Sequence, residues 1–328
     1  MTIEDQTKAV LVGLAAIGLT GCAPQETVPD EAATRPTKEA LIAQFDSALE
    51  IAAQTEGSGK PALWTLADED TTIHLFGTVH LLRPGVDWRS QAFEDALGAA
   101  DTIVLEVDMK SEEAQRAITT DFNQRGMFQD GQTLRSILEP GDEAMIEGAL
   151  STVGVPMDAF NAFEPWMVAI SLSSMKLLAE GYDLNSGVES VIEEVGQRSG
   201  KSFDYLEEIS DQADAFDLLP LETQIGYLYE TALLLEESPR MLDHLVAEWA
   251  DGDVVGLGAL VASPDSLGGG EQVYQSLLVN RNKKWLPKIE AMLDEPGTVF
   301  VAVGSGHLAG PDSVIEALRE QGYTVTGP

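Results

Sequence analysis

The chain has 328 residues, and its hydrophobic fraction of 44% is enough to bury the core of one large domain or two small ones. Asp and Glu number 55 against 19 Lys and Arg, so the formal net charge is −36. Such a surface repels nucleic acid, whose binding depends on basic side chains, and it favours cationic or metal partners.

The N-terminus carries a short apolar run over residues 9–20, too short to span a bilayer and of the length found in signal-peptide cores. The run ends at Leu19-Thr20-Gly21-Cys22, which resembles the lipobox of bacterial lipoproteins, and Cys22 is the only cysteine. The sequence therefore predicts a signal peptide over 1–22, lipidation at Cys22 and a lipid-anchored protein of the bacterial cell envelope that faces the periplasm. A buried N-terminal helix is the alternative.

The pattern after Cys22 divides into a tether and a folded domain. Residues 23–60 begin polar and aperiodic, with a possible helix at 41–57, and the domain is expected over 61–328. Two apolar runs separated by a turn predict a β-hairpin near 62–77. A helix at 87–101 and a strand at 102–108 follow.

The middle of the chain, residues 111–270, is largely helical by its period, with one short strand at 202–207. The Gly-rich stretch 251–270 is expected to be a surface loop. The helix predicted at 271–293 contains Pro287, which should kink it or split it in two. The chain ends with the pattern strand, helix, strand over 298–327.

Two histidines stand in the same local sequence context. Each follows a predicted strand and comes three residues after a glycine, His80 after Gly77 and His307 after Gly304. The sequence thus predicts an α/β fold, with a central β-sheet that carries two strand–GxxH–helix half-repeats and a large helical insertion. Ligands in such sheets bind at the carboxyl ends of strands, where two imidazoles could coordinate a metal. Both glycines are assigned to substrate binding, because glycine permits a sharp turn and a close approach to a ligand.

Charged residues in apolar surroundings complete the candidate site. Glu106 shares a strand face with Val104, and a buried carboxylate needs a partner, so it is a candidate metal ligand and catalytic group, or a structural ion pair. Arg281, with Asn282 beside it, falls on an apolar helix face and could orient Glu106 or stabilise an oxyanion; otherwise it reaches past the stripe to water. Glu207, assigned with the two glycines to substrate binding, either lines the site or solvates a strand end.

Other residues are assigned to packing or capping. His74 lies within a strand and His244 within a helix, and neither has the glycine context. Ser186 and Glu189 match the capping-box spacing, which we rank above catalysis for Glu189. The sequence contains no H-E-x-x-H zinc motif, no G-x-S-x-G nucleophile elbow and no phosphate-binding loop.

At these positions the chain resembles the TraB/PrgY/GumN family, which is related to the Tiki metalloproteases that act on Wnt proteins. The resemblance rests on "FGTVH", "TIVLEVD", "GVES", "YLEE", "LLVNRN" and the closing "VAVGSGHLAGPDSVIEALREQGYTV". It implies a site built from the two GxxH motifs, an acidic residue and the Arg/Asn position. The family usually has aspartate where Glu189 stands, and Pro287 departs from its usual helix.

These observations favour a divalent-metal-dependent hydrolase and, among hydrolases, a peptidase acting on a peptide or protein. His80, His307 and Glu106 would bind Zn, Mn, Co or Fe, and Arg281 with Asn282 would polarise or clamp the scissile carbonyl. The alternative is a lipoprotein that binds a metal, a haem or a peptide at the same site without turnover.

Overall fold

The computed structural model describes residues 35–261 and 270–328. The predicted signal peptide, its lipidation site Cys22 and the first part of the predicted tether lie outside these ranges. Among the helices of the described ranges, none is long and apolar enough to cross a membrane.

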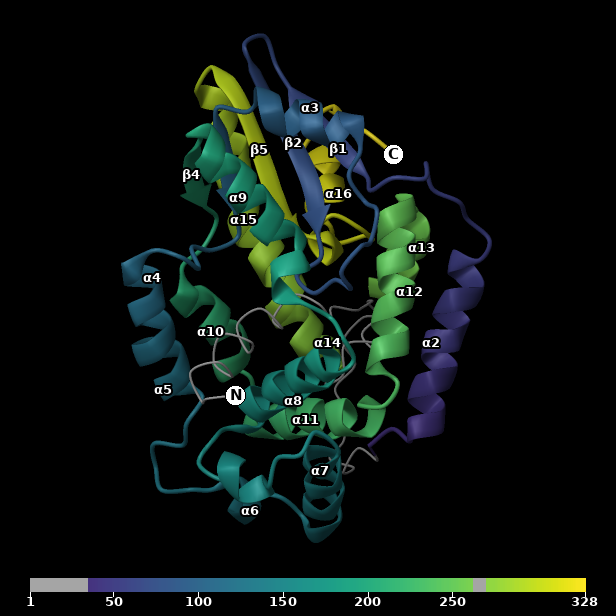
Figure 1. The fold of residues 1–328 in the computed structure, drawn as a ribbon, viewed down its shortest axis with the longest axis vertical. Coiled ribbons are helices and arrows are strands. Elements are labelled where there is room, and N and C mark those ends of the chain that lie inside the picture. The colour runs from purple at the N-terminus through teal and green to yellow at the C-terminus, as the bar shows by residue number, and fades with distance from the viewer. Residues whose placement is uncertain (1–34, 262–269) are drawn as a thin grey trace.

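One six-stranded sheet forms the upper part of the molecule, in the strand order β4-β3-β5-β2-β1-β6 (Figure 1). Its strands are β1 (Leu63–Ala67), β2 (Thr71–Thr78), β3 (Thr102–Leu105), β4 (Ser202–Tyr205), β5 (Gly297–Gly304) and β6 (Val325–Thr326). β1 runs antiparallel to β2 and β6, whereas β2, β5, β3 and β4 pair in parallel. The predicted hairpin and the predicted strands are confirmed.

The two half-repeats are crossover units, β2–α3–β3 and β5–α16–β6, whose helices cover opposite faces of the sheet. On one face, Phe93 of α3 (Gln91–Ala99) packs against Phe76 of β2, with ring centroids 4.9 Å apart. On the other, Leu318 of α16 (Val314–Glu320) shares a core with Leu75. Successive residues of a strand point to opposite faces, so the apolar run in β2 supplies both cores. The predicted α/β architecture with two half-repeats is confirmed.

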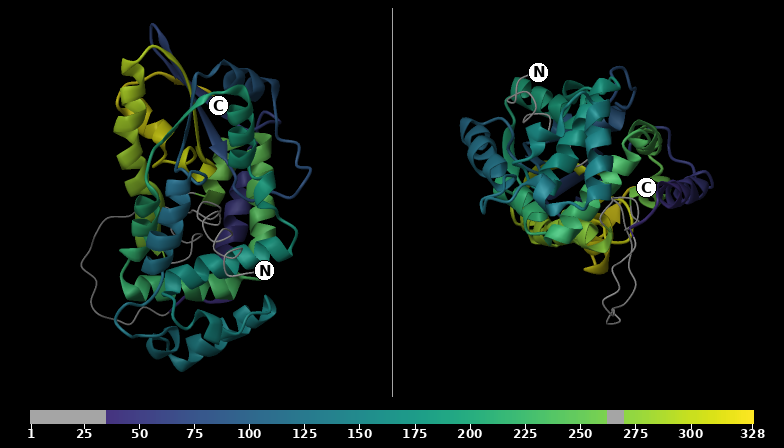
Figure 2. Two further views of the ribbon diagram at one scale, coloured as in Figure 1. Left: turned by 60° about the vertical axis from the view of Figure 1, so that its left-hand side comes forward. Right: turned by 90° about the horizontal axis from the view of Figure 1, so that it is seen from below.

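The insertion between β3 and β5 is mainly helical. Its α-helices are α4 (Glu112–Ala117), α5 (Asn123–Arg125), α6 (Leu134–Ile137), α7 (Pro140–Thr152), α8 (Pro165–Ala179), α9 (Val188–Ser199), α10 (Ile209–Asp217), α11 (Leu221–Leu234), α12 (Ser238–Asp251), α13 (Val254–Val261), α14 (Gly270–Tyr274) and α15 (Asn280–Ala291). Helices α7, α8 and α11 lie far from the sheet in Figure 1, and the left view of Figure 2 shows the same separation.

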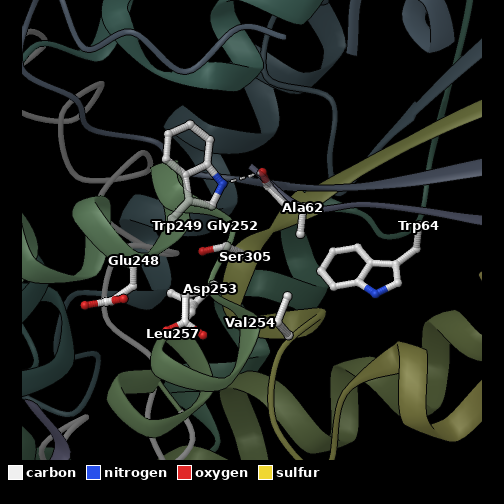
Figure 3. A pocket seen from close by; sticks show the side chains of 10 residues that line it. Ala62, Trp64, Glu248, Trp249, Gly252, Asp253, Val254, Leu257 and Ser305 are labelled. Atoms are coloured by element: carbon white, nitrogen blue, oxygen red, sulfur yellow. Dashed lines mark hydrogen bonds between the residues drawn. The ribbon is translucent and has the colours of Figure 1, made fainter. Parts of the chain in front are cut away.

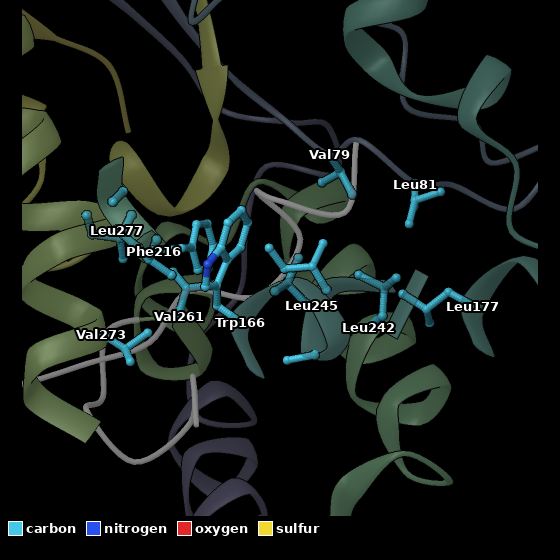
Figure 4. Close-up of a cluster of buried hydrophobic side chains, with 14 of the residues drawn as sticks. Val79, Leu81, Trp166, Leu177, Phe216, Leu242, Leu245, Val261, Val273 and Leu277 are labelled. Atoms are coloured by element: carbon cyan, nitrogen blue, oxygen red, sulfur yellow. The ribbon is translucent and has the colours of Figure 1, made fainter. Parts of the chain in front are cut away.

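A shared hydrophobic core joins the sheet to this helical part. Val79 and Leu81, which follow β2, are buried in one cluster with Trp166 of α8, Phe216 of α10 and Leu245 of α12 (Figure 4). The residues on either side of His80 are therefore anchored in the core. This packing fixes the backbone of the first GxxH segment against the helical insertion.

The expected surface loop at 251–270 is wrong in its first part, where residues 254–261 form α13, and its residues 262–269 lie outside the described ranges. Leu257 and Leu260 are 5% and 1% exposed, and burial of these side chains outweighs the helix penalty of the glycines in this segment. Helix α2 (Lys38–Ala52), which the sequence placed with the tether, packs on α13, because Phe45 and Leu260 share one apolar cluster.

Pro287 does not split the predicted helix, because α15 continues through it. The irregularity lies earlier, in a π-helical turn over Gln275–Val279 that joins α14 to α15. Pro287 has no N–H to offer the carbonyl four residues before it, that of Lys283. Both residues are exposed, so water can satisfy this carbonyl at little cost.

Candidate active site at the carboxyl ends of the strands

The two GxxH segments lie next to each other at the carboxyl ends of β2 and β5, as predicted. In the parallel ladder Gly77 is paired with Val303, and Thr78 with Gly304. A Cβ atom added at Gly77 would lie 3.1 Å from the Cα of Ser305, so glycine permits the close approach of the two strand ends. Neither Gly77 nor Gly304 has a positive φ, so the left-handed turns that favour glycine are not the reason for these two residues.

Glu106 and Glu207 follow neighbouring strands, β3 and β4. The N–H of Leu206 donates to the carbonyl of Leu105 at 2.9 Å, and that of Glu207 to the carbonyl of Glu106 at 2.8 Å, so strand pairing continues past both ends. Both side chains are buried, and Glu106 Oε1 accepts a bond from the N–H of Gly304 at 2.6 Å. Of its two predicted positions, Glu207 therefore takes the one that lines the site.

Arg281 places a positive charge between these carboxylates. Its Nη2 donates to Glu106 Oε2 at 2.6 Å and to Glu207 Oε1 at 2.5 Å, and its Nε donates to Glu207 Oε2 at 3.1 Å. Trp285, one turn later on α15, donates through Nε1 to Glu207 Oε2 at 3.1 Å, and its ring centroid lies 4.8 Å from the guanidinium carbon. Arg281 is 6% exposed, so the alternative in which it reaches past the apolar stripe to water is wrong.

The remaining N–H groups of Arg281 also have partners. Its Nη1 lies 3.1 Å from the carbonyl of Leu277, in the π-helical turn, and 3.1 Å from His307 Nε2. Arginine has five N–H donors, and these contacts together with those to the two carboxylates provide an acceptor for each. The predicted clamp on a scissile carbonyl would therefore require Arg281 to break a bond that it makes here.

The contacts of His307 define its tautomer. Because arginine can only donate, His307 Nε2 accepts from Arg281, and the ring proton lies on Nδ1. Nδ1 is 2.6 Å from Asn282 Oδ1, and Asn282 Nδ2 donates in turn to the carbonyl of Asp312 at 2.8 Å. Asn282, predicted to act beside Arg281 in catalysis, thus holds the imidazole of His307 in position.

The first histidine has a carboxylate partner, because His80 Nδ1 lies 2.6 Å from Glu189 Oε1. The capping box predicted for Ser186 and Glu189 is wrong: the N-cap of α9 is Gly187, which makes no side-chain capping bond, and Ser186 Oγ donates to Asp183. Both residues retain some exposure, 15% and 21% of their side chains. The Glu189 carboxylate thus contacts His80 and does not cap the N-terminus of α9.

The start of α9 fits closely against this segment. A Cβ atom at Gly187 would lie 2.2 Å from the carbonyl oxygen of His80, so only glycine allows this approach. The N–H of Val188 donates to the carbonyl of Val79 at 3.1 Å. The "GVE" sequence therefore holds the first GxxH segment through a close approach, a backbone bond and a side-chain contact.

The site shifts the pKa values of its residues in different directions. Burial opposes ionisation of Glu106, but the Arg281 charge, aided by the two histidines and the Gly304 N–H, lowers its pKa to about 2. Burial and then the Arg281 charge lower the pKa of His307 to about 3, with a further contribution from His80. Burial also disfavours charge on His80, yet the Glu189 carboxylate, with Glu106, outweighs it and raises its pKa. His307 therefore stays neutral, whereas His80 gains a proton more readily than usual.

The donor set fits a divalent metal ion by its chemistry. Two imidazoles with a carboxylate suit first-row metals, and in both His80 and His307 the Nδ1 atom lies 2.6 Å from a side-chain oxygen, so Nε2 is the ring nitrogen that would bind an ion. In the described part of the chain, no three His, Cys, Asp or Glu side chains are already gathered around one ion position. Arg281 accounts for this at His307 and Glu106, because its guanidinium contacts both.

The histidines assigned to packing lie in other environments. His74 Nδ1 on β2 lies 3.1 Å from Thr65 Oγ1 on β1, and the ring of His244 packs edge-on against Phe45, with 6.1 Å between the ring centroids.

A tryptophan of α12 supports the end of β2. The indole of Trp249 donates to the carbonyl of Gly77 at 2.8 Å and borders a small pocket (Figure 3). This bond helps to fix the end of β2.

Sequence reasoning missed several residues that position the site. Trp285 has a signal in its spacing, one helical turn after Arg281, and Gly187 has one in standing two residues before the acid that contacts His80. Gln212 of α10, whose Nε2 lies 3.5 Å from Glu106 Oε2, has no such signal. Its position depends on the packing of the helical insertion.

The fold and the site together define an α/β protein with one buried polar site at the carboxyl ends of its parallel strands. The chain belongs to the TraB/PrgY/gumN family, whose model matches residues 62–327. This match confirms the family predicted from the GxxH segments.

Two known proteins give more distant similarities. The chain is 23% identical over 315 residues to the metalloprotease TIKI1 of Danio rerio, across 80% of this chain and 62% of that protein. It is 20% identical over 270 residues to an uncharacterized protein of Treponema pallidum (strain Nichols), across 79% of this chain and 80% of that protein. The chain thus spans less than two thirds of the TIKI1 sequence, and no solved structure matches it.

Proposed function

We propose that the chain is a divalent-metal-dependent hydrolase that cleaves peptide bonds. The observation that carries this proposal is the meeting of both GxxH segments with the ionised carboxylate of Glu106 at adjacent strand ends. The similarity to a protein named as a metalloprotease supports the same reaction class. The proposal treats His80, His307 and Glu106 as the groups that would hold the ion.

Such an ion would polarise the scissile carbonyl and supply a hydroxide nucleophile at neutral pH. The chain's own residues prepare the site for that chemistry. Asn282 keeps the proton of His307 on Nδ1, and Glu189 lies against Nδ1 of His80, so in each ring Nε2 is the atom left for a ligand. The burial of Glu106, Glu207 and Arg281 excludes bulk water, which strengthens every charge interaction within the site.

The direct test is cleavage of a peptide library by the full-length chain in the presence of Zn²⁺, Mn²⁺ or Co²⁺. We expect cleavage that EDTA abolishes, and a loss of at least about a hundredfold in Glu106→Gln, the scale of a lost catalytic group. Glu112→Gln is the matched control, since Glu112 is exposed and pairs only locally with Arg116. Absence of cleavage with every ion would contradict the proposal.

One observation favours the second candidate, binding without turnover. Every N–H of Arg281 has an acceptor within the chain, so no arginine donor is free for a substrate carbonyl. A protein that holds a metal, a haem or a peptide at this site needs no such donor. Saturable ligand binding with no cleavage in the library assay would support this candidate.

We also propose that the protein is exported and lipid-anchored at Cys22 in the bacterial cell envelope, and that it does not bind nucleic acid. The short apolar run before Leu-Thr-Gly-Cys and the net charge of −36 support these proposals. The test is membrane fractionation and intact mass of the wild type and Cys22→Ala. Wild-type protein that stays in the cytosol with Met1 retained would overturn the anchor.

A further inference from the structure

Arg281 occupies the coordination position of the second histidine. An imidazole Nε2 has a single lone pair, and in His307 that lone pair accepts from Arg281 Nη1 at 3.1 Å. A metal ion bound at Nε2 needs the same lone pair. The guanidinium and the ion are therefore mutually exclusive at His307.

The charges around Arg281 also favour exchange for a more highly charged cation. Two buried carboxylates, Glu106 and Glu207, contact one guanidinium, and the remaining side-chain partner of that guanidinium is the acceptor nitrogen of His307. A monovalent guanidinium balances one of the two carboxylates. A divalent ion added beside it would meet an uncompensated negative charge in a site that excludes water, where attraction is strong.

The contacts of Arg281 divide into an anchor, a backbone bond to Leu277 within the same helical segment, and two contacts that can be exchanged. The anchor is the two-point pairing of Nε and Nη2 with Glu207, which Trp285 supports from the other side of that carboxylate. The exchangeable contacts are single bonds to His307 and Glu106. Arg281 can release these two while it stays paired with Glu207, because the bidentate pair is the stronger interaction.

We propose that Arg281 and a divalent ion compete for His307 Nε2 and Glu106, so that Arg281 sets the metal affinity of the site. This inference rests on the proposed function in one respect, namely that the site takes a divalent ion. Arg281 is accordingly a positioning residue that stabilises the ion-free arrangement, and its pairing with Glu207 is the contact that it keeps when the ion binds.

The first test compares Zn²⁺ affinity by titration calorimetry in the full-length wild type, Arg281→Met and the control Arg116→Met. Methionine keeps much of the side-chain length and removes every donor. We expect Zn²⁺ to bind Arg281→Met at least about tenfold more tightly, the scale on which groups around metal ligands alter affinity. An affinity equal to or weaker than that of the wild type would overturn the inference.

The second test uses the wild type alone and so does not depend on the folding of a variant. A crystal structure with Zn²⁺ should show the ion on His307 Nε2, the contact between Arg281 Nη1 and His307 broken, and the pairing with Glu207 retained. Zn²⁺ bound elsewhere, with the Arg281–His307 contact intact, would overturn the inference. Tighter Zn²⁺ binding by Arg281→Met without peptide cleavage would support the competition and refute the proposed function. Metal-activated cleavage with the Arg281–His307 contact intact would support the proposed function and overturn the competition.

Discussion

The two GxxH segments share a sequence frame and a backbone position, yet their histidines have opposite electrostatic surroundings. In each ring, Nδ1 lies 2.6 Å from a side-chain oxygen. For His80 that oxygen belongs to the carboxylate of Glu189, which outweighs the effect of burial and raises the pKa of the histidine. For His307 it belongs to the amide of Asn282, and burial together with the Arg281 charge lowers the pKa of the histidine to about 3. The same local motif thus gives one imidazole that is easily protonated and one that stays neutral.

The difference has its origin outside the motifs. Glu189 comes from the start of α9, and Arg281 and Asn282 come from α15, both within the insertion that separates the two half-repeats (Figure 1). The repeated strands place two equivalent histidines, and the insertion makes them unlike. Chemistry that needs one basic and one neutral imidazole can therefore be built on a duplicated frame.

The largest effect is expected from removing the charge that surrounds the second histidine. Arg281→Met leaves Glu106 and Glu207 buried without their shared cation, so we expect the free energy of unfolding at neutral pH to fall by about 3–5 kcal/mol. Urea denaturation measures it. Arg116→Met, which breaks an exposed pair with Glu112, should cost less than about 1 kcal/mol. Equal costs for the two variants would mean that the buried network contributes no special stability.

A smaller effect is expected at the start of α9, which holds the first histidine. Gly187→Ala forces a Cβ atom against the carbonyl oxygen of His80, so the loop or the helix must move, at about 1–3 kcal/mol. The control is Gly148→Ala on α7, where the added carbon meets no atom within 4 Å. Thermal denaturation should separate the two variants, and a Gly187→Ala protein as stable as the control would show that the close approach is dispensable.

The smallest effect is a difference in pH dependence between the two histidines. His80 has a folded-state pKa above its usual 6.5, so its contribution to stability is fully present below 6.5 and is lost as pH rises through the folded value. His307 has a folded-state pKa of about 3, so the unfolded chain takes up its proton first, and stability falls as pH drops below 6.5.

The measurement is urea denaturation of the wild type, His80→Gln and His307→Gln between pH 7.5 and 5.5. As the pH falls, the wild type should gain stability relative to His80→Gln and lose it relative to His307→Gln, by up to about 1.4 kcal/mol per pH unit. If both variants change with pH in the same direction, the electrostatic contrast between the segments is wrong.

The sequence was sufficient to predict what depends on repeated local pattern. The strand runs before Gly77 and Gly304 and the alternation around Glu106 are visible in single segments, and together they predict the sheet and the adjacent strand ends at these two glycines. The burial of Arg281 could be predicted from its position in an apolar helical stripe. These features depend on residues close together in the chain.

What the sequence left undetermined depends on contacts between distant segments. The spacing of Ser186 and Glu189 fits a capping box, but a contact of Glu189 with His80 exists only once α9 packs on the end of β2. Likewise, the glycines of α13 suggested a loop until its burial against α2 was known. Arg281 could be placed in the site, but the saturation of all its donors needed the positions of Glu207, His307 and Leu277 together.

The central claim is that both GxxH segments form one site, and a double-mutant cycle of metal affinity tests it most directly. Zn²⁺ binding is measured by calorimetry for the wild type, His80→Ala, His307→Ala and the double variant, with His244→Ala, whose ring packs against Phe45 of α2, as control. Each single variant should lose most of the affinity, and the double variant should lose little more, because residues that share one ion are not additive. Additive losses, or unchanged affinity in both single variants, would contradict the account.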